Sequence, residues 1–414
     1  MSAAVNLNPR SVGAYDGGAK LMLGSAVAGA LGFLGAVVML FVGSDEARAR
    51  AAHGYMLGFT YWAGIAVASI ILVAILHTMK AKWVTVLRRP LEVMGASSGL
   101  YALLFIPIFF VMPQLFMWVH DAEALFAQGA ISEVQVHHLH LKQSGYLNVP
   151  FFTVRQVIYF VSWILVSMFL LRWSRAQDID GNLGHTVKLR KLGPGSLPLL
   201  GLTMTFASFD WLMSLAPLWH STIFGVYYFS GSLLAAIALW TLLTIYTRGP
   251  NGFGTFVGPE HLHNQGKLLL AFTAFWAYIG FSQFMLIWAA NLPEEAPWYH
   301  VRIEGPWLGF SIALVVLHFV IPFFALLSRD LKRKPNLMAI VAFYVLVVHI
   351  IDLYWLILPT AYPDTGFVPA VSDLLAFVGI GGLGIASILW LMRRGHSLPV
   401  KDPYLADSMR YVQP

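Results

Sequence analysis

Residues 335–359 read PNLMAIVAFYVLVVHIIDLYWLILP, and Asp352 is the only side chain in this run that is charged at neutral pH. At about 1.5 Å of rise per residue, a helix of this length spans the roughly 30 Å hydrocarbon core of a bilayer. The whole chain has the same character, since 58% of its 414 residues are hydrophobic and 11% are charged. A soluble domain carries about 25% charged residues. With a mean hydropathy of +0.69, the composition excludes a soluble enzyme and predicts a polytopic membrane protein.

Nine further apolar segments have the length of a membrane span, so the sequence predicts an all-α protein with ten transmembrane helices. They cover residues 20–43, 53–78, 92–119, 150–172, 196–217, 222–247, 266–290, 306–328 and 371–392. The predicted organisation is a cytoplasmic N-terminal segment at 1–19, a ten-helix transmembrane domain at 20–393 and a cytoplasmic C-terminal tail at 394–414. The first helix is expected to stay as an anchor because no small-residue cleavage site follows it. No internal repeat is apparent by inspection.

The basic residues predict the orientation. One side of the predicted membrane has five of them, namely Arg48, Arg50, Lys142, Arg155 and Arg302. The other 21, which include Arg10 and Arg248, lie on the side that carries both termini. By the positive-inside rule both termini are cytoplasmic, which fits an even number of spans in a bacterial inner membrane. The net charge of +6 therefore reflects topology; the basic residues form no dense patch, and no nucleic acid is expected as a partner.

The absence of cysteine excludes disulfides, thiolate-held iron–sulfur clusters and covalent haem c attachment in this chain. Any redox centre therefore belongs to another chain or uses histidine. His137, His138 and His140 lie in the longest outer loop, 120–149. Without cysteines or paired carboxylates beside them, they are more typical of solvated surface than of a metal site.

Glycines in the first and last spans permit close helix contacts, although a lipid-facing position explains them equally well. They are Gly24, Gly29, Gly32 and Gly35 in the first span and Gly381, Gly382 and Gly384 in the last.

Four titratable residues lie inside predicted spans, where each costs a few kcal/mol and requires a partner or a function. They are Asp210, His318, His349 and Asp352. His349 and Asp352 are three residues apart and therefore share one helix face. The rise per residue places both histidines near the midplane and both aspartates nearer the outer face. The set of four predicts a proton path or a quinone cavity that runs from the middle of the bilayer outward.

Polar residues of the seventh span extend this predicted site. They are Ser282, Gln283 and Tyr278, and further hydroxyls come from Tyr227, Tyr228, Tyr344 and Tyr354. Two alternatives remain open: buried Asp and His also serve as structural links between helices, and tyrosines near span ends also act as interfacial anchors. A haem between His318 and His349, the only midplane pair, is a weaker alternative. Titratable residues near span ends are expected to be mostly structural, namely His53, His77, Glu92, Arg155, His261 and His263.

Three long stretches resemble one known family. They are KQSGYLNVPFFTVRQVIYF at 142–160, FASFDWLMSLAPLWHSTIFGVYYFSGS at 206–232 and AFTAFWAYIGFSQFMLIWAANLPEEAPWY at 271–299. They are similar to the F subunit of bacterial alternative complex III, an NrfD/PsrC-like membrane subunit of a quinol:cytochrome c oxidoreductase. The Asp210 motif also resembles the paralogous C subunit. The shorter chain and FSQFMLIWAANLPEE favour F.

The resemblance implies two four-helix bundles, spans two to five and six to nine, with the first and last helices at their sides. It implies no redox cofactor in this chain, menaquinol or ubiquinol as the substrate of the complex, and iron–sulfur clusters and haem c in partner subunits. The implied partners are the C paralogue, an iron–sulfur subunit, and multi-haem and mono-haem cytochrome c subunits. It carries over Asp210 as a site residue, and less firmly His349 and Asp352.

Three hypotheses follow from the sequence. The first is a cofactor-free subunit of a quinol oxidoreductase whose Asp210, Asp352, His349 and His318 line a polar half-channel for protons. The second is a purely structural scaffold of the same complex. The third is a stand-alone secondary transporter, for which proline-kinked spans such as those at Pro107, Pro113 and Pro322 argue only weakly because they do not pair as a repeat.

Overall fold

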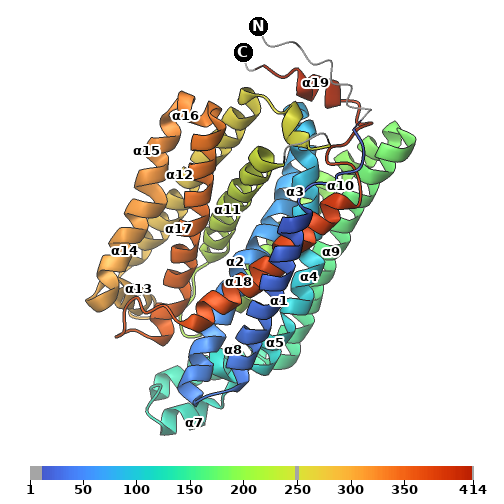
Figure 1. Cartoon of the computed structure of the whole chain (residues 1–414). Helices are drawn as coiled ribbons and strands as arrows, with labels where there is room; N and C mark the ends of the chain where they lie inside the picture. Colours follow the sequence, from blue (N-terminus) through green and yellow to red (C-terminus); the bar gives the residue numbers. More distant parts are fainter. Residues whose placement is uncertain (1–11, 248–250, 413–414) are drawn as a thin grey trace.

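The computed structural model describes residues 12–247 and 251–412, and its regular structure is helical throughout (Figure 1). The all-α prediction is confirmed for these residues. The predicted segment at 1–19 lies partly outside them, as do Arg10 and Arg248. Nine helical segments of the described chain are long and apolar enough to cross a membrane: α1 (Ala19–Phe41), α2 (Asp45–Thr78), Lys82–Phe110, α9 (Val149–Asp180), α11 (Phe224–Tyr246), α12 (Pro259–Ala290), Gly305–Leu327, α17 (Pro335–Ala361) and α18 (Val371–Arg393).

Two of these segments are interrupted by other helix types or by breaks. The first contains α3 (Arg88–Ala96), α4 (Ser98–Leu104) and α5 (Ile106–Phe110), and α6 (Met112–Leu115) follows it. The second contains α14 (Leu308–Val315), the π-helical segment η7 (Val316–Val320) and α15 (Ile321–Leu327). Pro107, Pro113 and Pro322 each lie at the start of one of the short helices, as expected for a residue that cannot continue the preceding hydrogen-bond ladder.

Of the remaining helices, α10 (Leu183–Trp211) packs along α2 and α9, and the others are short and lie mainly near the two ends of the molecule (Figure 1). The short helices are α7 (Ala122–Ala127), α8 (Glu133–Gly145), α13 (Ala296–Ile303), α16 (Arg329–Arg333) and α19 (Leu405–Met409). His137, His138 and His140 are exposed on α8.

The predicted span at 196–217 differs most from expectation. Its residues occupy the second half of α10 and the turn after it, and α10 is not among the nine apolar helices of the described chain. The physical reason is composition, because this half contains Pro198, Thr203, Thr205, Ser208 and Asp210. Nine of the ten predicted spans therefore correspond to helices of the described chain that are long and apolar enough to cross a membrane, and the count of ten is not confirmed.

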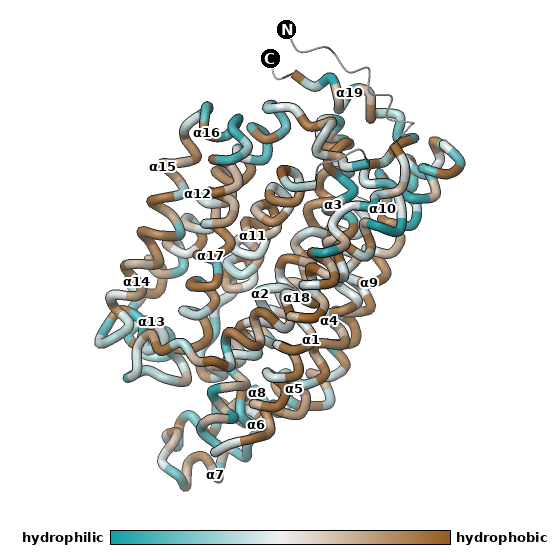
Figure 2. Tube along the Cα trace, in the orientation of Figure 1, coloured by the Kyte–Doolittle hydropathy of each residue, from teal (hydrophilic) through white to brown (hydrophobic). Residues whose placement is uncertain are grey.

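Hydrophobic residues occupy the middle of the molecule along the helix axes, and hydrophilic residues gather at its two ends (Figure 2). Large apolar side chains such as Leu31, Phe281 and Phe343 are exposed on the outside of this middle zone. Surface of this kind is stable only against an apolar solvent. The chain is therefore a multi-pass membrane protein.

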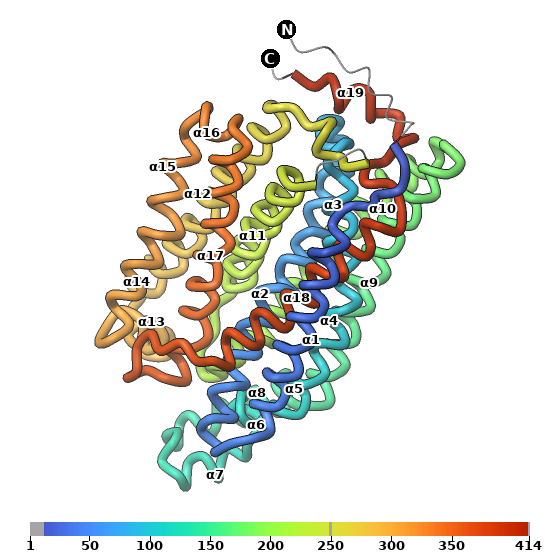
Figure 3. The backbone as a smooth tube through the Cα atoms, viewed as in Figure 1, coloured from blue at the N-terminus to red at the C-terminus, as the bar shows by residue number. Residues whose placement is uncertain are grey.

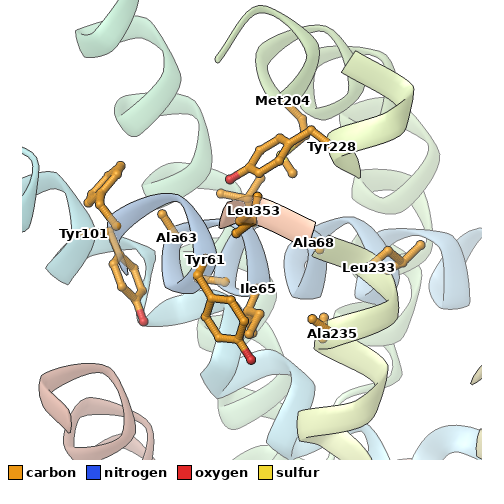
Figure 4. Packing of buried hydrophobic residues seen from close by; sticks show 14 of the residues in the cluster. Tyr61, Ala63, Ile65, Ala68, Tyr101, Met204, Tyr228, Leu233, Ala235 and Leu353 are labelled. Atoms are coloured by element: carbon orange, nitrogen blue, oxygen red, sulfur yellow. The ribbon is translucent and has the colours of Figure 1, made fainter. Parts of the chain in front are cut away.

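Two largely buried helices, α2 and α11, form the centre. They pack against each other, and small residues such as Ala68 and Ala235 lie in the buried interior (Figure 4). The Tyr228 hydroxyl of α11 donates to the Thr60 carbonyl of α2 at 2.6 Å. The Tyr61 hydroxyl of α2 donates to the carbonyl of Leu346, which lies on a third helix, α17, at 2.9 Å. These bonds connect the first half of the chain to the second.

The other helices form two groups around this centre (Figure 3). In the first helix group α3, α9 and α10 pack with α2, whereas in the second helix group α12 and α17 pack with α11 and are joined by the segment α14 to α15. α1 and α18 pack on each other, and α18 also packs on α2. The first and last membrane helices therefore lie side by side, next to the central pair.

Glycines allow the close contact of α1 with α18. A Cβ added at Gly29 would lie 2.5 Å from the backbone nitrogen of Leu383, and one at Gly382 would lie 2.7 Å from the Gly29 Cα. Of the two alternatives for these glycines, the close helix contact therefore holds at Gly29 and Gly382. Gly24 has open space around it, which agrees with the alternative of a lipid-facing position.

Gly382→Val is expected to lower the free energy of unfolding by about 1–3 kcal/mol, because the added methyls would strike the α1 backbone. Thermal unfolding of the purified protein in detergent measures this effect. Gly24→Val is the matched control, since it adds the same β-branched residue in open space. Equal melting temperatures for the two variants would contradict the proposed contact.

The two ends of the described chain meet at one end of the molecule. Ala14 forms an isolated β-bridge with His396, and Arg393 donates to the Gly17 carbonyl at 2.8 Å. The predicted C-terminal tail is packed rather than loose, because Leu398 and Leu405 are buried. An even number of crossings follows if both ends lie on one side of a membrane.

A buried ion network lies at this same end. Arg88 forms ion pairs with Glu92 at 2.8 Å and with Asp402 at 2.9 Å. Arg89 forms an ion pair with Glu92 at 3.0 Å and another with Asp178. Glu92 was expected to be structural, and its position between two arginines agrees with that. The network ties the C-terminal tail to α3 and α9.

Candidate functional site

The most buried acid of the second helix group is Asp352 on α17. The Tyr227 hydroxyl of α11 donates to its Oδ1 at 2.6 Å, and the Trp276 indole of α12 donates to its Oδ2 at 3.2 Å. Three helices therefore converge on one carboxylate. Trp276 was not identified from the sequence, because an indole in an apolar helix is indistinguishable there from ordinary core.

His349 lies one turn before Asp352 on the same helix face, as the spacing predicts. Its Nδ1 is 3.3 Å from Asp352 Oδ2. His318 reaches this pair from η7, and its ring centroid lies 6.1 Å from that of His349. One ligand atom from each of the three residues lies within 4.8 Å of the other two. The predicted association of His318, His349 and Asp352 is therefore present in the structure.

The two imidazoles are enclosed and unsatisfied. His318 is 2% exposed and His349 is 1% exposed. Neither ring nitrogen of either residue has a hydrogen-bond partner among the described residues. An unsatisfied buried polar group costs about 1–3 kcal/mol, so an imidazole pair of this kind requires an explanation.

Local backbone features place this cluster. A π-helical turn shifts the register of a helix by one residue and is frequent at functional sites; here it carries His318 between α14 and α15. Gly231 of α11 faces the cluster, since a Cβ there would lie 2.9 Å from His349 Cε1 and 3.1 Å from Asp352 Oδ2. The absence of a side chain at Gly231 thus leaves room for His349 and Asp352.

The haem alternative does not fit this packing. Trp276 lies on His318 with 4.0 Å between ring centroids, and Tyr61 lies 5.3 Å from His349. Asp352 is within 4.8 Å of both imidazoles. These neighbours occupy the space that a porphyrin would need.

Further polar groups lie between the cluster and the end of the molecule opposite the termini. Gln283 of α12 donates to the Tyr299 hydroxyl at 3.1 Å, and the Ser221 hydroxyl donates to Gln283 Oε1 at 3.4 Å. Gln283 therefore lies inside, as predicted. Tyr278 is 65% exposed on the outside of α12, and Ser282 is partly exposed. Neither of these two lines the cluster.

Arg302 is a fully buried guanidinium near these groups. It lies 3.5 Å from the Trp298 ring centroid and donates to the carbonyls of Trp355 and Leu356 at 3.2 and 3.0 Å. The negative end of the α17 helix dipole therefore faces this cation. Burial lowers the pKa of the Arg302 side chain to about 9, so it stays protonated at neutral pH.

Asp210 belongs to a different site, in the first helix group. Arg155 of α9 donates to both of its carboxylate oxygens, at 2.8 Å and 2.9 Å. Tyr159 and Gln156 donate to Asp210 Oδ2 at 2.8 and 3.1 Å. The hydrogen bonds of the Asp210 carboxylate in the described chain thus come from α9, and none of them comes from the His318, His349 and Asp352 cluster.

The expectation for Arg155 changes as a result. The sequence places it near a span end, where a long side chain extends to the interface. In the structure it is buried and paired, and it also lies 3.7 Å from the Tyr146 ring centroid. The chain folds α9 against α10, which encloses the guanidinium together with its acid.

The two helix groups carry matched motifs, although inspection of the sequence finds no repeat. α2 has Gly-x-x-Tyr-aromatic-x-Gly at 58–64, and α11 has the same pattern at 225–231. Pro-aromatic-aromatic-x-Val-Arg ends at Arg155 in the first half and at Arg302 in the second. Asp210 and Asp352 each precede a proline by seven residues. This repeat would have singled out Arg302, which sequence reasoning placed only among the outer basic residues.

Matched positions have different partners in the two halves. The first half pairs its arginine with its aspartate, whereas the second half pairs its aspartate with His349, Tyr227 and Trp276. Comparison with known proteins adds no further assignment, since no protein-family model matches the sequence and no curated protein is recognisably similar to it. The contacts of these residues are therefore the basis for inferring a function.

Proposed function

We propose that the chain is a cofactor-free integral membrane subunit of a bacterial quinol:cytochrome c oxidoreductase of the alternative complex III type. The single observation that carries the proposal is the buried cluster of His318, His349, Asp352 and Tyr227. Four titratable groups from α11, η7 and α17 converge in a zone that would otherwise be apolar. Such a concentration is expensive in a membrane and is typical of proton relays.

The proposed chemistry is proton transfer. Oxidation of a quinol releases both hydroxyl protons as its electrons leave, and these protons need acceptors. An imidazole accepts and donates through its two nitrogens, and the short Tyr227–Asp352 bond offers the next step. Gln283 and Ser221 extend the polar groups toward the end opposite the termini. In this proposal protons move between the midplane and that end.

The proposed architecture follows the same assignment. α10 is the tenth crossing, α2 to α10 and α11 to α17 form two four-helix bundles, and α1 and α18 lie at their sides. Both termini are cytoplasmic in a bacterial inner membrane. The partners are the C paralogue, an iron–sulfur subunit and the multi-haem and mono-haem cytochrome c subunits, and the quinol is menaquinol or ubiquinol.

A scaffold role is the second candidate, and the Asp210 site favours it for the first helix group. The two charges of this site compensate each other, because Arg155 binds both oxygens of Asp210. A saturated ion pair holds two helices together and leaves no free acceptor for a proton. The proposal therefore assigns proton transfer to the Asp352 cluster and a structural role to Asp210.

His349→Gln tests the proposal in the assembled complex. Glutamine keeps a polar side chain of similar length but does not titrate, so quinol-driven turnover per assembled complex is expected to fall about tenfold or more. His137→Gln on the exposed face of α8 is the matched control and should leave turnover unchanged. A lower yield of complex with unchanged turnover per complex would instead support the scaffold and contradict the relay.

A further inference from the structure

We propose that His318, His349 and Asp352 also form a binding site for a divalent transition-metal ion of the Zn²⁺ type. Two imidazoles and one carboxylate are a common set of protein ligands for zinc, with a fourth position left for water or another ligand. They are the one group of at least three His, Cys, Asp or Glu in the described chain whose ligand atoms lie close enough together.

The distances fit a tetrahedral ion with a small adjustment. Ligand bonds of about 2.0–2.1 Å in a tetrahedron place neighbouring donor atoms roughly 3.3 Å apart. His349 Nδ1 and Asp352 Oδ2 are already 3.3 Å apart. One donor atom from each of the three residues lies within 4.8 Å of the other two, so tetrahedral spacing requires a movement of about 1.5 Å or less, which we assign to His318. Rotation of its side chain on η7 supplies a movement of this size.

The imidazole nitrogens provide an independent reason. All four nitrogens of His318 and His349 are buried without a hydrogen-bond partner among the described residues. The approach of His349 Nδ1 to Asp352 lacks hydrogen-bond geometry, although the two atoms are close. A metal ion would satisfy one lone pair on each ring and would also compensate the charge of Asp352.

The surroundings hold the carboxylate ligand in place. Tyr227 donates to Asp352 Oδ1 and Trp276 donates to Oδ2, which is the kind of outer hydrogen bonding that orients metal ligands. Gly231 keeps the space beside His349 and Asp352 free of a side chain. Because the donors are enclosed, the ion is expected to enter while the protein folds into the membrane.

A bound ion has a consequence that rests on the proposed function. Zn²⁺ would occupy the imidazole lone pairs and the carboxylate oxygen that a proton relay uses. Quinol-driven turnover of the zinc-loaded complex is therefore expected to fall about tenfold or more relative to the zinc-free complex. The same three side chains would then serve either as a relay or as an inhibitory metal site.

The test uses the full-length protein produced with and without added zinc, and zinc per chain is measured by elemental analysis after purification. One zinc per chain is expected in the unaltered protein, and at least a tenfold lower content in His318→Gln and His349→Gln. His137→Gln/His138→Gln is the matched control and should keep its zinc. Growth with cobalt supplies a readout without any substitution, because tetrahedral Co²⁺ with nitrogen ligands shows strong visible absorption bands.

The outcomes separate the two proposals. No zinc and no cobalt bands in the unaltered protein would overturn the metal site and leave the relay standing. Zinc retained in both His variants would place the ion elsewhere and would also overturn it. Zinc bound as expected, with turnover of the complex unaffected, would confirm the metal site and contradict the relay.

Discussion

Asp352→Asn is expected to lower quinol-driven turnover of the assembled complex by about 10²-fold, which is the usual contribution of a positioned acid or base. Asparagine has nearly the same shape, and its carbonyl oxygen still accepts a hydrogen bond from Tyr227 or Trp276. The asparagine amide does not titrate, so the substitution prevents proton transfer between His349 and Tyr227. Turnover per complex, with complex content quantified separately, measures the effect.

Asp364→Asn is the control for this experiment. It makes the same chemical change at an exposed position between α17 and α18, and turnover should stay within experimental error of the unaltered complex. Equal turnover for Asp352→Asn and Asp364→Asn would show that the buried carboxylate only links helices. The proposed proton relay would then have no acid in the second helix group.

Arg155→Ala is expected to destabilise the protein by about 3–5 kcal/mol, because it leaves the Asp210 carboxylate buried without its cation. Removal of both partners in Arg155→Ala/Asp210→Ala should restore part of this loss, since no buried charge then remains. Thermal unfolding in detergent or the yield of folded protein measures the change. Arg48→Ala is the control, because its partner Asp45 is exposed and surface pairs contribute about 0–1 kcal/mol.

The Arg155 series also separates structure from function. If the ion pair is structural, turnover per assembled complex in Arg155→Ala/Asp210→Ala should match the unaltered complex even though the yield falls. A loss of turnover as large as that of Asp352→Asn would indicate that Asp210 takes part in proton transfer. Asp210 and Asp352 occupy matched positions in the two halves of the chain but have different hydrogen-bonding partners. This comparison therefore tests whether the position or the bonded partners of an aspartate determine its role in proton transfer.

Prediction from sequence succeeded where a local rule was sufficient. Helix length, apolar composition and the bilayer dimension together predict the nine apolar helices. The spacing of three residues puts His349 and Asp352 on one face, and the structure has them 3.3 Å apart. Glycines in the first and last spans permitted close helix contacts while a lipid-facing position stayed open, and Gly29 and Gly382 make such a contact. The apolar helices and the pairing of His349 with Asp352 follow from residues that are close together in the chain.

Prediction was weakest where two distant helices must meet. Asp210 and Asp352 were expected to share one path, but Asp210 is bonded to Arg155 of α9. Gln283 and Tyr278 lie on the same helix, and only Gln283 faces inward. Burial of Arg302 depends on the carbonyls at the end of α17, more than 50 residues further along the chain. A single sequence contains no measure of which helix faces become neighbours.

The amino-acid sequence by itself determined that the chain is helical, crosses a membrane several times and carries His349 beside Asp352. These properties depend on hydropathy and on the 3.6-residue period, which act over short stretches of chain. Only the tertiary structure decided that His318, Tyr227 and Trp276 join that pair while Asp210 does not. The physical reason is packing: which side chains meet is settled by the contacts of whole helix faces, here around α2 and α11.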